Sequence, residues 1–313
     1  MRDPIAQFLA QCPVMILDGA LATELERRGA DLHDPLWSAK LLIDQPGLIR
    51  AVHRDYFEAG ADLATTATYQ ATFATFERRG IDARGAAALM RDAVALAIAV
   101  RDEFWSDASR REHRLRPLVA ASVGPYGAML ADGSEYRGEY GLSDTALSDF
   151  HRPRLRVLAQ SPADLLACET IPSLQEALVL ARLLQEFPAA SAWISFSCRD
   201  GAHTCEGQEI GACVARLNEF AQVISVGVNC TRPEYIGPLL RQMRNHTDKP
   251  LLAYPNSGER YDAGAKRWLG AAAASIAEQA CHWHAEGARL IGGCCRTTPD
   301  DIRALRRALL QCA

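Results

Sequence analysis

The sequence reads VISVGVN at Val223–Asn229, an apolar run rich in β-branched residues, and then PEYIGPLLRQM at Pro233–Met243, which has helical spacing. The same order recurs along the chain. Apolar runs predict further strands at Val14–Asp18, Leu63–Thr66, Leu118–Ser122, Leu165–Glu169, Trp193–Phe196, Leu251–Tyr254 and Leu290–Gly292. Helices are predicted between them, among others at Pro46–Ala59, Ala86–Trp105, Leu174–Glu186, Gly211–Phe220, Ala271–Glu286 and Pro299–Leu310. Eight β/α units in 313 residues predict the α/β class and a single (β/α)₈ TIM-type barrel, one domain over residues 1–313.

Two predicted connections are longer than a barrel needs. They are Leu25–Gln45, after the first strand, and Gly124–Ser143, after the third, which is rich in Gly, Tyr and acidic residues. Both follow the carboxyl end of a strand, where barrel enzymes carry their chemistry. We expect them to border a catalytic face, with surface decoration as the other interpretation.

Charge and hydropathy narrow the range of partners. The net charge is -4, from 34 Lys and Arg against 38 Asp and Glu, so the chain lacks the broad basic surface that nucleic acid needs. The longest apolar stretch without a charge, Ala93–Val100, is far shorter than the roughly 20 residues of a membrane span. Asp3 and Pro4 interrupt any signal peptide. We therefore expect a cytoplasmic protein with small-molecule partners, whose 10 cysteines are thiols, metal ligands or catalytic groups rather than disulfides.

Three cysteines follow predicted strands. Cys230 comes directly after the sixth strand, and Cys294 and Cys295 follow Gly292 and Gly293 at the end of the eighth. Neighbours in a regular strand point to opposite faces, so we expect the two glycines to permit an irregular turn in which both sulfurs face one point. Three thiolates favour Zn²⁺ and leave an open fourth position. A redox disulfide or two core thiols are the alternatives for the adjacent pair.

Other strand ends carry groups suited to an amino acid. Glu169 could bind a substrate ammonium group, with an ordinary ion pair as the alternative. Asp18 either forms a turn or cap or binds substrate, and backbone amides at Gly19 suit a carboxylate. Trp37 and Tyr69 are core residues or part of a cation-binding cage. The remaining singled-out residues are interpreted as structural or without a role: Cys12, Cys198, Cys205, Cys213, Cys281, His282, His284 and Cys312.

Taken in order, these strand-end motifs resemble the zinc-dependent homocysteine S-methyltransferases almost from end to end. The motifs are Leu17-Asp18-Gly19-Ala20, Pro35-Leu36-Trp37, Thr66-Ala67-Thr68-Tyr69-Gln70, Cys168-Glu169-Thr170-Ile171-Pro172, Gly227-Val228-Asn229-Cys230 and Gly292-Gly293-Cys294-Cys295-Arg296-Thr297-Thr298-Pro299. The resemblance implies a barrel that transfers a methyl group to L-homocysteine and yields methionine. It implies zinc ligands at Cys230, Cys294 and Cys295, the homocysteine amine at Glu169, and the amino-acid end of the substrate near Asp18 and Gly19. Asn229, Trp37 and Tyr69 complete the candidate substrate-binding residues.

The segment Tyr254-Pro255-Asn256-Ser257-Gly258-Glu259 looks like the branch that uses S-methylmethionine or S-adenosylmethionine. The chain has no room for the folate and cobalamin domains of other relatives. We expect S-methylmethionine as the better donor, S-adenosylmethionine as a weaker one, and betaine and methylfolate as inert, in a monomer or weak dimer. The alternatives are a betaine-homocysteine methyltransferase and a non-enzymatic zinc or thiol redox-sensing protein.

Overall fold

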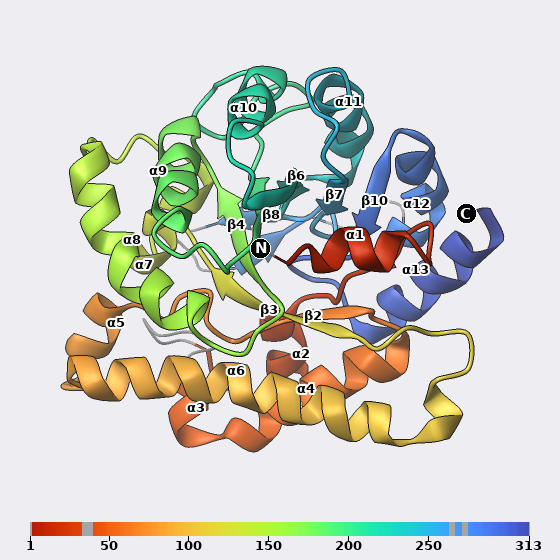
Figure 1. Cartoon of the computed structure of the whole chain (residues 1–313), viewed down its shortest axis with the longest axis horizontal. Helices are drawn as coiled ribbons and strands as arrows, with labels where there is room; N and C mark the ends of the chain where they lie inside the picture. The colour runs from red at the N-terminus through yellow and green to blue at the C-terminus, as the bar shows by residue number, and fades with distance from the viewer. Residues whose placement is uncertain (1, 33–39, 263–266, 271–274, 313) are drawn as a thin grey trace.

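Eight parallel strands form the centre of the molecule in the computed structural model, which describes residues 2–32, 40–262, 267–270 and 275–312 (Figure 1). The strands lie in the order β1 (Met15–Ile16), β10 (Ala288–Ile291), β7 (Leu251–Tyr254), β6 (Val223–Asn229), β5 (Ala192–Phe196), β4 (Leu165–Ile171), β3 (Leu118–Val123) and β2 (Leu63–Thr65). A parallel bridge between Leu17, just after β1, and Leu63 of β2 joins the two ends of this order, so the ring of strands closes. The predicted (β/α)₈ barrel is therefore confirmed.

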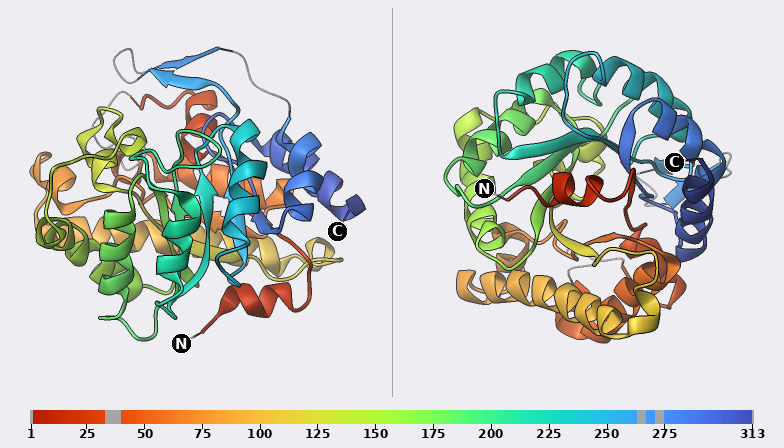
Figure 2. Two further views of the ribbon diagram at one scale, coloured as in Figure 1. Left: turned by 90° about the horizontal axis from the view of Figure 1, so that it is seen from above. Right: turned by 45° about the vertical axis from the view of Figure 1, so that its right-hand side comes forward.

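Helices surround the barrel (Figures 1 and 2). Their bounds are α1 (Pro4–Leu9), α2 (Leu21–Arg27), α3 (Leu41–Asp44), α4 (Pro46–Ala59), α5 (Phe73–Glu77), α6 (Ala83–Ser106), α7 (Tyr126–Leu130), α8 (Asp144–Ala159), α9 (Leu174–Leu184), α10 (Ile210–Leu217), α11 (Pro233–Met243), α12 (Ile276–Ala285) and α13 (Pro299–Cys312), with short 3₁₀ turns η2 (Ala108–Arg110) and η3 (Ser134–Tyr136). Among the described residues, no helix has both the length and the hydropathy to cross a membrane.

The sequence located all eight barrel strands, with differences at their ends. The first strand was predicted over Val14–Asp18 but pairs regularly only at Met15–Ile16. The helix predicted at Ala271–Glu286 begins at Ile276, and residues 271–274 lie outside the described residues. The antiparallel pair β8 (Arg260–Asp262) and β9 (Arg267–Leu269), which follows β7, was not predicted from the sequence.

The two ends of the barrel differ. α1 lies across the end where the strands begin (Figure 2), and its buried Ile5 and Phe8 pack with the inward-facing Met15, Leu165 and Trp193. The β8–β9 pair projects beyond the opposite end (Figure 2, left). The amino-terminal end is thus closed by apolar packing, and the carboxyl ends of the strands remain for a site.

The expectation that the cysteines form no disulfides was wrong for one pair of residues. A disulfide joins Cys281 of α12 to Cys312, the last residue of α13, with the two Cα atoms 5.9 Å apart. These residues are 31 positions apart in the sequence, and only the packing of α12 beside α13 brings them together. The other eight cysteines are free thiols.

Candidate metal and substrate site

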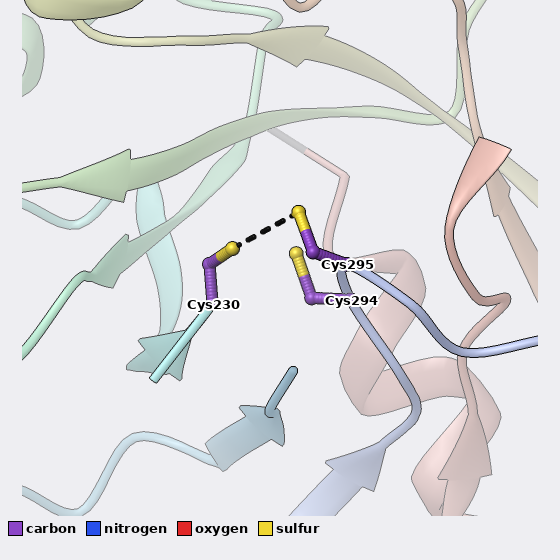
Figure 3. A group of neighbouring side chains, drawn as sticks. All are labelled: Cys230, Cys294 and Cys295. Carbon is purple, nitrogen blue, oxygen red and sulfur yellow. Dashed lines mark hydrogen bonds between the residues drawn. The ribbon is translucent and has the colours of Figure 1, made fainter. Parts of the chain in front are cut away.

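The three strand-end cysteines converge at the carboxyl end of the barrel (Figure 3). The sulfur atoms of Cys230, Cys294 and Cys295 all lie within 4.8 Å of one another. Cys230 Sγ is 3.3 Å from Cys295 Sγ. Cys230 has a φ of 46°, a left-handed conformation that turns the chain sharply after β6. The structure thus assembles the group that the strand order predicted, although 64 residues separate Cys230 from Cys294 in the sequence.

The adjacent cysteines lie in an irregular turn, as expected, but the glycines before them act differently from the prediction. Neither Gly292 nor Gly293 has a positive φ. A Cβ atom on Gly292 would lie 2.5 Å from Leu17 Cβ, and one on Gly293 would lie 2.3 Å from Thr297 Oγ1. The glycines therefore permit close packing rather than an unusual backbone conformation. Hydrogen bonds from Thr297 N and Oγ1 to the Cys294 carbonyl, at 3.1 and 2.6 Å, then close the turn.

The surroundings of the cluster favour a thiolate. Hydrogen bonds from the thiols of Cys294 and Cys295 lower the pKa of Cys230 well below its ordinary value. The Tyr136 hydroxyl is also 3.1 Å from Cys230 Sγ. Because the negative charge gathers on Cys230, the pKa values of the other two thiols are raised. Three clustered soft ligands of this kind suit a thiophilic metal ion.

Glu169 is the inward-facing carboxylate of β4. Alternation along this strand directs Leu165 and Ala167 into the barrel, and Glu169 follows with the same parity. The Ser122 hydroxyl donates to Glu169 Oε1, and the Tyr254 hydroxyl donates to Oε2 at 3.0 Å. Burial raises the pKa of Glu169 to about 7.

Within the described part of the chain, Glu169 forms no ion pair. The ordinary ion pair considered from sequence is therefore not found there, and the carboxylate is suited to a cation brought by a ligand.

Asp18 follows β1 and lines the same pocket as Glu169. Its Oδ2 accepts a hydrogen bond from Thr65 N at 2.8 Å, and its carboxylate also bonds the Thr65 hydroxyl. Burial raises the pKa of Asp18 well above its ordinary value, and the nearby charge of Glu169 raises it further. α2 has Ala20 as its N-cap without a side-chain bond, so Asp18 does not cap that helix.

One pocket contains the cysteines and both carboxylates. Four acidic side chains line it: Asp18, Glu26, Glu135 and Glu169. No Lys, Arg or His is found among the described residues of its lining. The pocket is therefore acidic, and its carboxylates are suited to ligand groups that carry positive charge.

The remaining candidates fall in three different places. Gly19 and Tyr69 line the pocket, as expected. Asn229 is buried beneath the pocket lining, where its Oδ1 accepts from Thr170 N at 2.7 Å and from the Ser195 hydroxyl at 2.8 Å. Its Nδ2 lies 3.8 Å from Cys294 Sγ, so it ties three strand ends together beside the cysteines. Trp37 lies outside the described residues.

The sequence did not mark several aromatic or acidic residues of the pocket; besides Glu26, they include three from later parts of the chain. Glu135 and Tyr136 belong to η3, inside the long connection Gly124–Ser143 whose composition had marked it as a candidate for the catalytic face. Trp268 comes from β9 of the hairpin that the sequence did not reveal. Only the first two had a signal in the sequence, namely the clustering of Tyr and acidic residues after the third strand.

Comparisons with known proteins agree with this geometry. The model of the homocysteine S-methyltransferase family matches residues 15–309. Over 304 residues, 97% of this chain and 96% of the relative, the chain is 51% identical to homocysteine S-methyltransferase YbgG of Bacillus subtilis. It is 48% identical over 307 residues to homocysteine S-methyltransferase of Escherichia coli, covering 97% of this chain and 98% of the relative. The crystal structure of the metallated form of the homocysteine methyltransferase MmuM from Escherichia coli superimposes with a TM-score of 0.88 at 46% identity, covering 97% of this chain and 99% of that one. This chain belongs to the homocysteine S-methyltransferase family, a family of methyltransferase enzymes.

Proposed function

We propose that this protein transfers a methyl group from a sulfonium donor to the sulfur of L-homocysteine and yields methionine, with Zn²⁺ held by Cys230, Cys294 and Cys295. The observation that carries the proposal is the group of three cysteine sulfurs within 4.8 Å of one another, in a pocket with a buried carboxylate. The names of the relatives support homocysteine as the acceptor.

The donor set fits zinc. Three protein ligands leave a fourth position open, as in catalytic zinc sites, and thiolates are soft ligands. The Escherichia coli relative has been crystallised in a metallated form. Bound zinc would lower the pKa of the homocysteine thiol, so that the nucleophilic thiolate is available at neutral pH.

The residues of the chain itself would hold the amino-acid part of homocysteine. Glu169 would bind the ammonium group, because it is buried and forms no ion pair among the described residues. Asp18 and the backbone at Gly19 would border the same end of the substrate. Burial deprives the Glu169 carboxylate of hydration, and the positive charge of a bound ammonium group compensates for that loss. The carboxylate therefore ionises as the substrate binds.

The acidic pocket favours a sulfonium donor. S-methylmethionine carries a sulfonium, an ammonium and a carboxylate, one net positive charge, whereas betaine is neutral overall. In the transfer, a bond forms between the homocysteine sulfur and the methyl carbon, while the bond from that carbon to the sulfonium sulfur breaks. The electron pair stays on the leaving sulfur as a neutral thioether, so no general acid is required. S-methylmethionine would be the better donor and S-adenosylmethionine a weaker one, since its nucleoside needs more room.

A zinc-storage or redox-sensing role would use the same cysteines but would need no amino-acid pocket. Glu169 and Asp18, two buried carboxylates that line the same pocket as the cysteines, therefore favour the enzyme. The proposal keeps the other expectations from sequence: one barrel domain, a monomer or weak dimer, and a cytoplasmic location. Size-exclusion chromatography tests the oligomeric state.

Elemental analysis and a donor panel test the main proposal. We expect about one zinc per chain and methionine formation with S-methylmethionine, slower turnover with S-adenosylmethionine, and none with betaine or methylfolate. Cys295→Ser removes one ligand and should abolish most turnover and lower the zinc content. Cys12→Ser, at the other end of the barrel, is the matched control and should change neither. Full zinc occupancy with normal turnover in Cys295→Ser would refute the assignment of Cys295 as a zinc ligand. A preference for betaine would refute the proposed methyl donor.

A further inference from the structure

Glu135 is a carboxylate of the pocket that the mechanism above does not use. It lies in η3, within the long connection after β3, and lines the same pocket as the cysteines. The turn around it is fixed by hydrogen bonds. Asp132 Oδ1 accepts from Ser134 N at 2.9 Å, and the Ser197 hydroxyl donates to the Glu135 carbonyl at 2.9 Å. The backbone at Glu135 is thus held against the end of β5.

One oxygen of the Glu135 carboxylate lacks a hydrogen-bond partner among the described residues. Its Oε2 is buried and has no hydrogen bond within the described residues, and Glu135 forms no ion pair among them. Desolvation accordingly raises the pKa of Glu135 to about 7. A buried carboxylate oxygen without a donor is costly, and a cationic group of a ligand would remove that cost.

The position of Glu135 indicates which ligand group it meets. The next residue, Tyr136, places its hydroxyl 3.1 Å from Cys230 Sγ, so Glu135 belongs to the wall that adjoins the cysteines. Its charge acts on the phenols of both Tyr69 and Tyr136, and aromatic faces of this kind also suit a sulfonium ion. Glu169 is held separately, on β4, by Ser122 and Tyr254. Glu135 and Glu169 are therefore two separately held carboxylates of the pocket, and neither forms an ion pair among the described residues.

We propose that Glu135 binds the α-ammonium group of the methyl donor and selects sulfonium donors that are amino acids. The inference rests on the proposed function, in which both substrates are α-amino acids and each brings one ammonium group. Glu169, deep in the barrel, binds the ammonium group of homocysteine, and Glu135 binds the ammonium group of S-methylmethionine. A donor without an ammonium group gains nothing from Glu135.

A matched pair of donors tests the inference. 4-(Dimethylsulfonio)butanoate has the sulfonium, the chain and the carboxylate of S-methylmethionine but no ammonium group. In Glu135→Gln, which keeps the shape and loses the charge, the KM for S-methylmethionine should rise about 10- to 100-fold. The KM for the butanoate, the KM for homocysteine and the zinc content should stay within about twofold of the wild type. Glu139→Gln, an exposed residue of the same connection, is the control and should change none of them.

Other outcomes overturn the inference in distinguishable ways. An unchanged KM for S-methylmethionine in Glu135→Gln, an equal rise for both donors, or a rise for homocysteine instead would each refute it. Glu135→Asp keeps the charge and should recover part of the loss, which provides a second test if the Gln variant folds poorly. A wild-type protein that does not use S-methylmethionine at all would instead refute the proposed function.

Discussion

Glu169→Gln is the sharpest test of how the barrel binds homocysteine. The substitution preserves the size of the side chain, and an amide oxygen can still accept from Ser122 or Tyr254, but the negative charge is lost. A charge-assisted hydrogen bond contributes about 1.5–3 kcal/mol, so we expect the KM for homocysteine to rise by roughly 10- to 150-fold. The zinc content should not change, because Glu169 is not one of the clustered sulfur ligands.

The pH dependence gives this prediction a second readout. Burial raises the pKa of Glu169 to about 7, so below that pH the protonated wild-type carboxyl loses its attraction for an ammonium group. The ratio of the KM of Glu169→Gln to that of the wild type should therefore be small at low pH and reach its maximum above pH 7. Effects of pH on the homocysteine thiol are common to both proteins and cancel in this ratio.

The assay is the initial rate of methionine formation at saturating donor, with homocysteine varied between about pH 6 and 8. Ser122→Ala, which removes one hydrogen bond to Glu169 but keeps the charge, serves as the control and should raise the KM by less than about tenfold. A KM that is unaltered in Glu169→Gln, or a ratio independent of pH, would refute the assignment of the ammonium group to this carboxylate.

Three further substitutions test buried residues of the barrel and of its surrounding helices. Asn229→Ala leaves the Thr170 amide without the acceptor that lies 2.7 Å away in the wild type. The free energy of unfolding, measured by urea titration, should therefore fall by about 1–3 kcal/mol, while zinc is retained. An unchanged midpoint of the urea transition would contradict this. Burial lowers the pKa of His53 to about 4, below its ordinary 6.5, so the stability it contributes is present above pH 6.5 and is lost as the pH falls. Between pH 7 and pH 5, the free energy of unfolding of His53→Leu should therefore fall by about 2 kcal/mol less than that of the wild type. Equal decreases in the two proteins would refute this. In Gly227→Ala the new Cβ would lie 1.9 Å from the Leu252 carbonyl oxygen. We therefore expect the free energy of unfolding to fall by about 3 kcal/mol or more, measured by thermal unfolding. A Tm equal to that of the wild type would count against this.

The sequence by itself determined the barrel and the cysteine group. Period-two and helical patterns are local, and β/α alternation forces parallel strands whose carboxyl ends share one rim. Residues at the carboxyl ends of the predicted strands, such as Cys230 and Glu169, were therefore assigned to one site without any knowledge of contacts. Local signals also located helix starts, as at Pro299, where α13 begins.

The tertiary structure alone decided which side chains outside the strand ends enter the pocket. Glu135 and Trp268 belong to a loop and a hairpin without periodicity, and their positions depend on contacts with distant segments, such as the bond from Ser197 to the Glu135 carbonyl. The disulfide of Cys281 likewise depends on the packing of two helices. Local periodicity fixes which elements form and which way their faces point, whereas the approach of loops and helices is set by long-range packing, which no short stretch of sequence encodes.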